Sequence, residues 1–163
     1  MDIELLPMTN DDREQAVDIF NYYVENTFAA FPEQKLPYAF FDAMFEKTND
    51  YPAVTAKDKK GVVLGFGMLR PHNPFPTFSS IAEITYFLKP QVTRKGIGTK
   101  MLEYLEARTR EKRITTILAP ISSLNQGSIA FHAKNGFKEC GRIKQAVIKK
   151  GKTFDVVLMQ KML

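Results

Sequence analysis

Residues 83–99 read Glu-Ile-Thr-Tyr-Phe-Leu-Lys-Pro-Gln-Val-Thr-Arg-Lys-Gly-Ile-Gly-Thr and decide the fold, because they join a strand pattern to a glycine turn that opens a helix. Gly96 and Gly98 allow the backbone to come close to a ligand. The first N–H groups of the following helix have no partner inside it and lie at its positive dipole end. We therefore expect an anion site here, with a phosphate or pyrophosphate as its guest.

Two common phosphate loops do not fit this turn. A P-loop needs Gly-x-x-x-x-Gly-Lys-Ser/Thr, and the order Gly98-Thr99-Lys100 does not match it. A dinucleotide fingerprint requires a third glycine where this chain has Met101. Gly-x-Gly alone is also compatible with an ordinary strand-to-helix turn, so a second signal is needed.

The second signal is the run at residues 125–137, Asn-Gln-Gly-Ser-Ile-Ala-Phe-His-Ala-Lys-Asn-Gly-Phe. With the glycine turn it resembles the coenzyme A site of the GCN5-related N-acetyltransferase superfamily, Arg/Gln-x-x-Gly-x-Gly/Ala followed by Asn-x-x-(Ser/Ala)-x-x-(Phe/Leu)-(Tyr/His)-x-x-x-Gly-Phe. Residues 19–27, Ile-Phe-Asn-Tyr-Tyr-Val-Glu-Asn-Thr, resemble its phosphinothricin and methionine-sulfoximine acetyltransferase branch. One position departs, since the usual Arg or Gln of the loop is Thr93.

Composition limits the class of protein. The 163 residues are expected to form one domain, residues 1–163, with its own core. No apolar run is long enough for a bilayer or a signal peptide, so we expect a cytoplasmic protein without a membrane partner. The single cysteine, Cys140, is expected to be a small buried strand residue rather than a nucleophile. No metal site is expected, because no Cys or His pair has zinc spacing.

The net charge of +5 comes largely from lysines, which are dense at residues 57–60 and 149–152. Both clusters are typical of hairpin turns, so we interpret them as solvated turn charge. Nucleic-acid binding is not expected, because aromatic residues do not alternate with the basic ones. A positive field also favours a polyanionic cofactor.

Apolar spacing and turn residues predict the elements. Helices are expected from about Asp11, over 38–47, 99–112 and 128–135, and strands over 3–6, 54–57, 62–69, 81–88, 116–119, 137–147 and 153–161. The proline-containing segments 26–37 and 71–80 are predicted loops. The order of strand 81–88, helix 99–112 and strand 116–119 predicts a parallel βαβ unit.

The predicted fold class is therefore α+β, with helices on both faces of the sheet. The resemblance implies αβα layers and a mixed, mostly antiparallel sheet of the GNAT type, in which the central strands splay apart.

The resemblance also implies acetyl-CoA as co-substrate. Its pantetheine arm and acetyl carbonyl are expected on the open backbone edge of Tyr86, Phe87 and Leu88, as in strand addition, and a backbone N–H near Leu88 could stabilise an oxyanion. The residues expected around the pyrophosphate are Arg94, Lys95, Gly96, Ile97, Gly98 and Thr99. Asn125 is expected to hydrogen-bond the coenzyme arm or the strand-to-helix turn.

Acetyl transfer to an amine needs a base, because the amine is an ammonium at neutral pH. Glu83 is our candidate, since it starts an apolar strand, shares a face with Thr85 and Phe87, and matches the family's catalytic glutamate. His132 stands at the Tyr/His position of the motif and is expected to protonate the departing thiolate. A solvated strand-end carboxylate and a structural helix histidine are the respective alternatives.

Acceptor selection is expected from segments that border the acceptor pocket in the resembling branch, at Thr27, Phe31, Arg70, Phe75 and Phe78. The Arg70 guanidinium suits a paired contact with an acceptor carboxylate, and an exposed strand-end charge is the alternative. The Arg-rich acceptor loop of the branch is altered here, so phosphinothricin itself is not assigned.

We therefore predict an acetyl-CoA-dependent N-acetyltransferase that acts on a small-molecule amine, an amino acid or an analogue, by direct transfer in a ternary complex. The resemblance also implies a homodimer. Two alternatives stay open: a protein or peptide acceptor, and a coenzyme A-binding regulatory module without catalysis. The Pro- and Phe-rich segment 71–80 favours a lid over an open peptide groove, and the presence of Glu83 and His132 favours catalysis.

Overall fold

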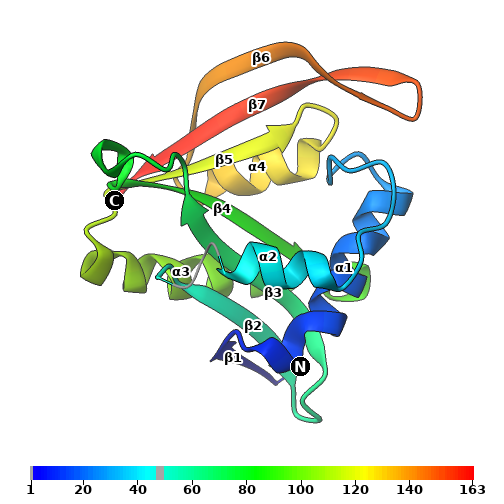
Figure 1. Ribbon diagram of the computed structural model, residues 1–163, viewed down its shortest axis with the longest axis vertical. Coiled ribbons are helices and arrows are strands. Elements are labelled where there is room, and N and C mark those ends of the chain that lie inside the picture. The colour runs from blue at the N-terminus through cyan, green and yellow to red at the C-terminus, as the bar shows by residue number, and fades with distance from the viewer. Residues whose placement is uncertain (1, 47–49) are drawn as a thin grey trace.

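The structure is a computed structural model that describes residues 2–46 and 50–163. Within these residues seven strands form a sheet in the order β1-β2-β3-β4-β5-β7-β6 (Figure 1). The strands are β1 (Ile3–Pro7), β2 (Ala53–Asp58), β3 (Val63–Pro71), β4 (Ile81–Leu88), β5 (Thr116–Ser122), β6 (Lys138–Lys149) and β7 (Lys152–Met162). The helices are α1 (Arg13–Asn26), α2 (Ala39–Glu46), α3 (Ile97–Thr109) and α4 (Gln126–Lys134).

Strand pairing confirms the predicted fold class. Neighbouring strands of the described sheet are antiparallel except β4 and β5, which are parallel and are connected through α3. The predicted βαβ unit is therefore confirmed. The predicted helix 38–47 corresponds to α2, and the last predicted residue, Lys47, lies outside the described residues. No helix among the described residues is long and apolar enough to cross a membrane.

β4 and β5 separate after a short parallel contact, and Figure 1 shows the two strands diverging. Their register pairs are Ile81 with Thr116, Ala82 with Ile117, and Glu83 with Leu118. Beyond these pairs β4 continues along β3 as far as Leu88, while β5 continues along β7 as far as Ser122. One edge of β4 therefore has no described strand beside it over residues 84–88, which confirms the splayed central strands.

Each face of the sheet carries its own apolar core. α3 packs on one face, where Met101 and Leu105 are fully buried. α1 and α2 cover the other face, where Val17 and Phe41 pack against Phe66 of β3. Because successive side chains of a strand point to opposite faces, β4 contributes to both cores. The helices therefore lie on both faces, as predicted.

The first lysine cluster is only partly solvated. The turn itself is as predicted, since the N–H of Gly61 donates to the carbonyl of Asp58 at 2.9 Å. Lys57, however, is largely buried, and its Nζ lies 2.6 Å from Oδ1 of the buried Asp12. Asp12 also accepts the N–H of Thr9 at 3.0 Å in the capping box that starts the first helical segment. The interpretation of Lys57 as turn charge is therefore wrong, because it pairs with a buried carboxylate.

The second lysine cluster contains a buried ammonium. Lys150 and Gly151 form the expected hairpin turn with φ values of 50° and 73°. Lys149 is fully buried, which contradicts the prediction of solvated charge, and its Nζ donates to the carbonyls of Thr27 at 2.8 Å and Ala30 at 2.7 Å. Burial lowers the pKa of Lys149, and the neighbouring Lys150 charge adds to this effect. The tip of the β6–β7 hairpin is thereby tied to the loop after α1.

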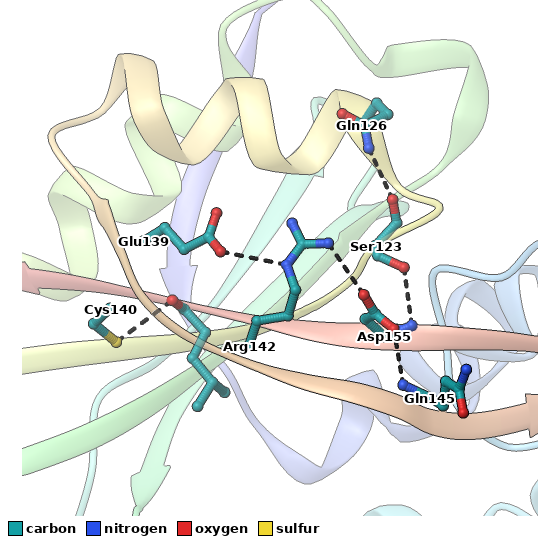
Figure 2. Close-up of polar contacts among 8 residues, drawn as sticks. Ser123, Gln126, Glu139, Cys140, Arg142, Gln145 and Asp155 are labelled. Carbon is teal, nitrogen blue, oxygen red and sulfur yellow. Dashed lines mark hydrogen bonds and ion pairs between the residues drawn. The ribbon is translucent and has the colours of Figure 1, made fainter.

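Asp155 of β7 organises an irregularity in β6. The register between the two strands shifts between Ile143 and Val147. Figure 2 shows Arg142 and Gln145 converging on the Asp155 carboxylate, which accepts the Gln145 N–H at 2.8 Å and lies 3.2 Å from Nη1 of Arg142. The Gln145 N–H, followed by the Arg142 side chain, lowers the pKa of Asp155. The ionised carboxylate therefore fixes the point where β6 departs from regular pairing.

Cys140 is exposed on β6, so the prediction that it is buried is wrong. Its thiol donates to the carbonyl of Leu158 at 3.4 Å (Figure 2). The register between β6 and β7 also shifts between Glu139 and Gly141, which interrupts the alternation of faces. A rule based on strict alternation therefore fails at this position.

We expect Lys149→Met to destabilise the protein. Methionine keeps an apolar stem of similar length, but it leaves the buried carbonyls of Thr27 and Ala30 without their donor, at a cost of about 1 to 3 kcal/mol. Urea unfolding would measure the change, with Lys144→Met on the exposed part of the same strand as the matched control. Equal stability of the two variants would show that the Lys149 contacts contribute nothing.

Candidate active site

The glycine turn begins α3 beside the open edge of β4. Gly96 is the N-cap of α3 with φ of 79°, and Arg94 also has a left-handed φ of 60°. No side chain caps this helix in the described structure, so the N–H groups of its first turn need a partner from elsewhere. Such a turn is already arranged to bind an anion.

Gly98 lies against α4, a contact that the sequence did not indicate. A Cβ at this position would lie 3.3 Å from ring atoms of Phe131 on α4. The missing side chain therefore allows α3 to approach α4 closely. Gly96 differs, because a Cβ there would meet nothing within 4 Å, and its positive φ is what favours glycine.

Two side chains fix the turns on either side of the open edge. Thr93, which stands at the usual Arg or Gln position, donates its hydroxyl to the carbonyl of Pro90 at 2.8 Å. Asn125 is the N-cap of α4, and its Oδ1 accepts the N–H of Ser128 at 3.2 Å. Of the two contacts expected for Asn125, the one within the strand-to-helix turn is therefore present.

The backbone of β4 presents polar groups to the opening. The N–H of Lys89 donates to the carbonyl of Leu64 on β3 at 2.8 Å, and backbone groups alternate in direction along a strand. The groups of Leu88 and Tyr86 therefore face the edge from which β5 has diverged. The backbone groups of Phe87 point to β3 instead, so the prediction that they belong to the open edge is wrong, because neighbouring residues of a strand bond in opposite directions. The Leu88 carbonyl accepts the hydroxyl of Tyr23 from α1 at 2.6 Å.

Tyr23 was not among the predicted site residues. Burial, followed by the neighbouring Tyr22, raises its pKa, so the hydroxyl stays protonated and donates. A signal was present in the sequence, because a tyrosine on an otherwise apolar helix face needs a hydrogen-bond partner when it is buried.

His132 forms a hydrogen-bonded pair with Tyr86 on the α3 side of the sheet. Nδ1 of His132 lies 2.7 Å from the Ser128 carbonyl, which can only accept, so Nδ1 carries the proton. Nε2 therefore accepts the Tyr86 hydroxyl at 2.6 Å. Burial raises the pKa of Tyr86 and lowers the pKa of His132, so both side chains are neutral at pH 7. The proton between them belongs to Tyr86.

Glu83 lies in a cluster with two cationic or potentially cationic side chains. It faces Arg70 directly across β3 and β4, and Nη2 of Arg70 contacts its Oε2. Nδ1 of His72 lies 2.9 Å from Oε1. His72 was not predicted as a site residue, and a lone loop histidine gives no signal of this contact. Arg70 is half-exposed, and no described acceptor other than Glu83 is in contact with its guanidinium.

The remaining predicted acceptor residues fall into two groups. Phe78 lies near the Glu83 cluster, with its ring 5.9 Å from that of His72, and Phe75 of the same loop is exposed. Thr27 ends α1, where its hydroxyl donates to the Tyr23 carbonyl at 2.7 Å, and Phe31 follows in the exposed part of that loop.

Two further features of the described surface were candidates for a site, a metal centre and the surface hollows. Among the described residues, no three His, Cys, Asp or Glu side chains lie together in a way that could hold a metal ion. Two surface hollows, one beside α1 and α2 and one beside residues 35–38, contain none of the predicted site residues.

Comparisons with known proteins agree with this geometry. A model described as "Acetyltransferase (GNAT) family" matches residues 16–137. The L-methionine sulfoximine/L-methionine sulfone acetyltransferase of Pseudomonas aeruginosa is 31% identical over 144 residues, which cover 87% of this chain and 84% of that protein.

Two solved structures are also similar over nearly the whole chain. A GNAT superfamily phosphinothricin acetyltransferase from Sinorhizobium meliloti, in complex with AcCoA, has a TM-score of 0.93 and 27% identity and covers 100% of this chain and 89% of its own. A ribosomal-protein-alanine N-acetyltransferase from Brucella melitensis has a TM-score of 0.91 and 31% identity and covers 98% of this chain and 99% of its own.

We expect the buried His132 to make stability depend on pH. Burial lowers its pKa below the 6.5 of an unperturbed histidine, so below pH 6.5 the unfolded chain binds the proton more readily than the folded one. Its contribution is therefore complete above pH 6.5 and is lost as pH falls towards the folded pKa, by up to about 1.4 kcal/mol per pH unit. Urea unfolding at about pH 7.5 and about pH 5.5 measures the difference.

Two histidine variants separate the contribution of His132 to the pH dependence from that of the other titrating groups. His132→Gln keeps an acceptor for Tyr86 and should remove this part of the pH dependence, whereas His72→Asn should retain it. An unchanged pH dependence in His132→Gln would contradict the assignment of the buried imidazole.

Proposed function

Because this chain belongs to the acetyltransferase (GNAT) family, we propose that it transfers the acetyl group of acetyl-CoA to the primary amine of an amino acid or an analogue, directly within a ternary complex. The observation that carries the proposal is the unpaired edge of β4 beside the uncapped start of α3. An open strand edge suits the amide-rich pantetheine arm, and a helix start suits a pyrophosphate. The names of the similar proteins support an amino-acid analogue as acceptor.

In this proposal the coenzyme is held mainly by the backbone. The amides of residues 94–99 bind the pyrophosphate, and the open edge at Tyr86 and Leu88 binds pantetheine. Both groups of amides are set in place by the fold, so little ordering is needed when the ligand binds. Thr93 is occupied by its bond to Pro90, so charge compensation for the phosphates is assigned to Arg94 and Lys95.

The chemical step requires a proton to leave the acceptor and the amine to attack the thioester carbonyl. Glu83 is the proposed base, directly or through one water. A backbone N–H at Leu88 is the proposed donor to the oxyanion. The departing thiolate takes its proton from the hydrogen-bonded pair of His132 and Tyr86, in which the Tyr86 hydroxyl holds the proton, and the second proton that the nitrogen loses as the amide forms restores this pair.

A peptide acceptor is the second candidate, because the Brucella melitensis protein is named for a ribosomal-protein alanine. Thr27, Phe31, Arg70, Phe75 and Phe78 are the proposed acceptor-binding residues. Phe75 and Phe78 are exposed in the 71–80 segment, and we propose that they cover a small ligand rather than line an open groove.

We also propose that residues 1–163 act as one catalytic domain, as a homodimer and in the cytoplasm, without a metal, a nucleic acid or a membrane as partner. The dimer is supported by the exposed Ile143 and Ile148 on the edge strand β6.

A thiol-release assay tests the activity. The acceptor panel should contain free amino acids, L-methionine sulfone, L-methionine sulfoximine, simple amines and a peptide with an N-terminal alanine. We expect acetyl-CoA-dependent turnover with at least one amino acid or analogue and little with the peptide. Tight binding of acetyl-CoA in calorimetry without turnover of any acceptor would instead favour a regulatory module.

We expect Glu83→Gln to lower kcat by about a hundredfold or more, because the amide cannot accept the proton. The dissociation constant for acetyl-CoA should change little, since Glu83 does not belong to the proposed coenzyme site. Glu139→Gln is the matched control, because Glu139 also contacts an arginine but lies on the edge strand β6. Wild-type turnover in Glu83→Gln would remove Glu83 as the base.

A further inference from the structure

The Glu83 carboxylate is occupied at both oxygens. Oε2 contacts the Arg70 guanidinium, and Oε1 accepts the Nδ1 proton of His72 at 2.9 Å. The Glu83 side chain is 13% exposed, whereas Arg70 is 44% exposed and His72 33%. The carboxylate is therefore the inner member of the cluster, and both partners approach it from the solvent side.

This arrangement hinders the role that Glu83 has in the proposed function. Each carboxylate oxygen already contacts a donor side chain, so an incoming ammonium finds both oxygens engaged. A base in this state needs at least one of its oxygens to be released before it can deprotonate an acceptor. The carboxylate would be released if either Arg70 or His72 moved away from Glu83 when the acceptor binds.

Arg70 is the partner that can leave. The half-exposed Arg70 reaches Glu83 from the surface, so water can hydrate its guanidinium when the pair opens. Guanidinium groups also pair well with any carboxylate that offers two oxygens. A second carboxylate at this position would therefore compete with Glu83 for Arg70 at little cost.

An α-amino acid has the right shape for this exchange. Its carboxylate and its amine are bonded to the same carbon, and Arg70 and Glu83 are register neighbours on adjacent strands. If the acceptor carboxylate binds the guanidinium, the acceptor amine lies next to the oxygen that the guanidinium has left. Arg70 then recognises the carboxylate of the acceptor, and the neighbouring Glu83 deprotonates its amine.

We propose that Arg70 exchanges its partner: it pairs with Glu83 in the free enzyme and with the acceptor carboxylate in the ternary complex, and thereby releases Glu83 as the base. This inference rests on the proposed function. The proton passes from the acceptor ammonium to Oε2, either directly or through a water, and the amine lone pair is then free to attack the thioester. Only an acceptor with a carboxylate releases the base.

His72 is the positioning residue in this partner exchange, because it holds the Glu83 carboxylate while Arg70 moves. Its Nδ1–H continues to donate to Oε1 when Arg70 leaves, so the carboxylate keeps its orientation towards the acceptor. The imidazole ring lies against the ring of Phe78, with 5.9 Å between the centroids, which restricts its own movement.

The test compares two acceptors that differ by one carboxylate. One is the best amino acid of the acceptor panel, and the other is the amine that lacks its carboxyl group; for L-methionine sulfone this is 3-(methylsulfonyl)propylamine. Arg70→Met should lower kcat/KM for the amino acid by about tenfold or more. The same variant should raise kcat for the amine by about two- to fivefold, because the base is no longer held.

Two further arginine variants exclude simpler explanations. Arg70→Lys keeps a cation beside Glu83, so it should not raise kcat for the amine. Arg13→Met removes another half-exposed arginine that pairs with a carboxylate, Asp42 at 3.1 Å, at the start of α1. It should leave both acceptors at the wild-type rate, and thermal melting of all variants checks that they are folded.

The outcomes separate the exchange from plain substrate binding. If Arg70 only binds the acceptor carboxylate, Arg70→Met lowers the rate with the amino acid and leaves the amine unchanged. If Arg70 only supports the structure, both rates fall. Either result overturns the exchange while the proposed function stands. A wild type that acetylates no amino acid of the panel overturns both.

Two variants of His72 test whether its hydrogen bond to Glu83 supports turnover. His72→Asn retains a donor near the position of Nδ1 and should keep kcat for the amino acid within about threefold of the wild type. His72→Leu should lower it by about tenfold with an unchanged KM for acetyl-CoA. Equal loss in both variants would show that the hydrogen bond to Glu83 is not what matters.

Discussion

The structure depends on the separation of β4 and β5. β4 stays paired with β3 over residues 82–88, and β5 stays paired with β7 over residues 116–122, but β4 and β5 stay together over three register pairs only. The space beyond is bordered by α4, where Phe131 and His132 both contact the ring of Tyr86. The hydrogen bond between Tyr86 and His132 therefore links β4 to the helix that follows β5, across the point where the sheet has opened.

The alternation of β4 places two kinds of chemistry on opposite faces. Tyr86 points to the α3 side, where it meets His132 among apolar side chains. Glu83 lies among charged and exposed side chains near the 71–80 loop. A single strand can therefore supply a protonated hydroxyl on one side and a carboxylate on the other, while its open edge stays unpaired beyond Glu83. The period of two in a strand is sufficient to separate these roles.

Much of this arrangement was predictable, because it depends on local patterns. The apolar run 81–88, the turn at Gly96 and the motif that begins at Asn125 each specify their own conformation. The contacts that were missed connect residues far apart in sequence. Lys149 has the same local pattern as a solvated turn lysine, and only the carbonyls of Thr27 and Ala30 show that it is buried.

Contacts between residues far apart in sequence were also missed in the candidate site. The sequence indicated Glu83 and Arg70 separately, as a base and as a carboxylate ligand, because each residue type suits that task. It could not indicate that they contact each other, since this depends on the register between β3 and β4. A shift of the register by one residue would place the two side chains on opposite faces. The contact between Glu83 and Arg70 is therefore a property of the sheet.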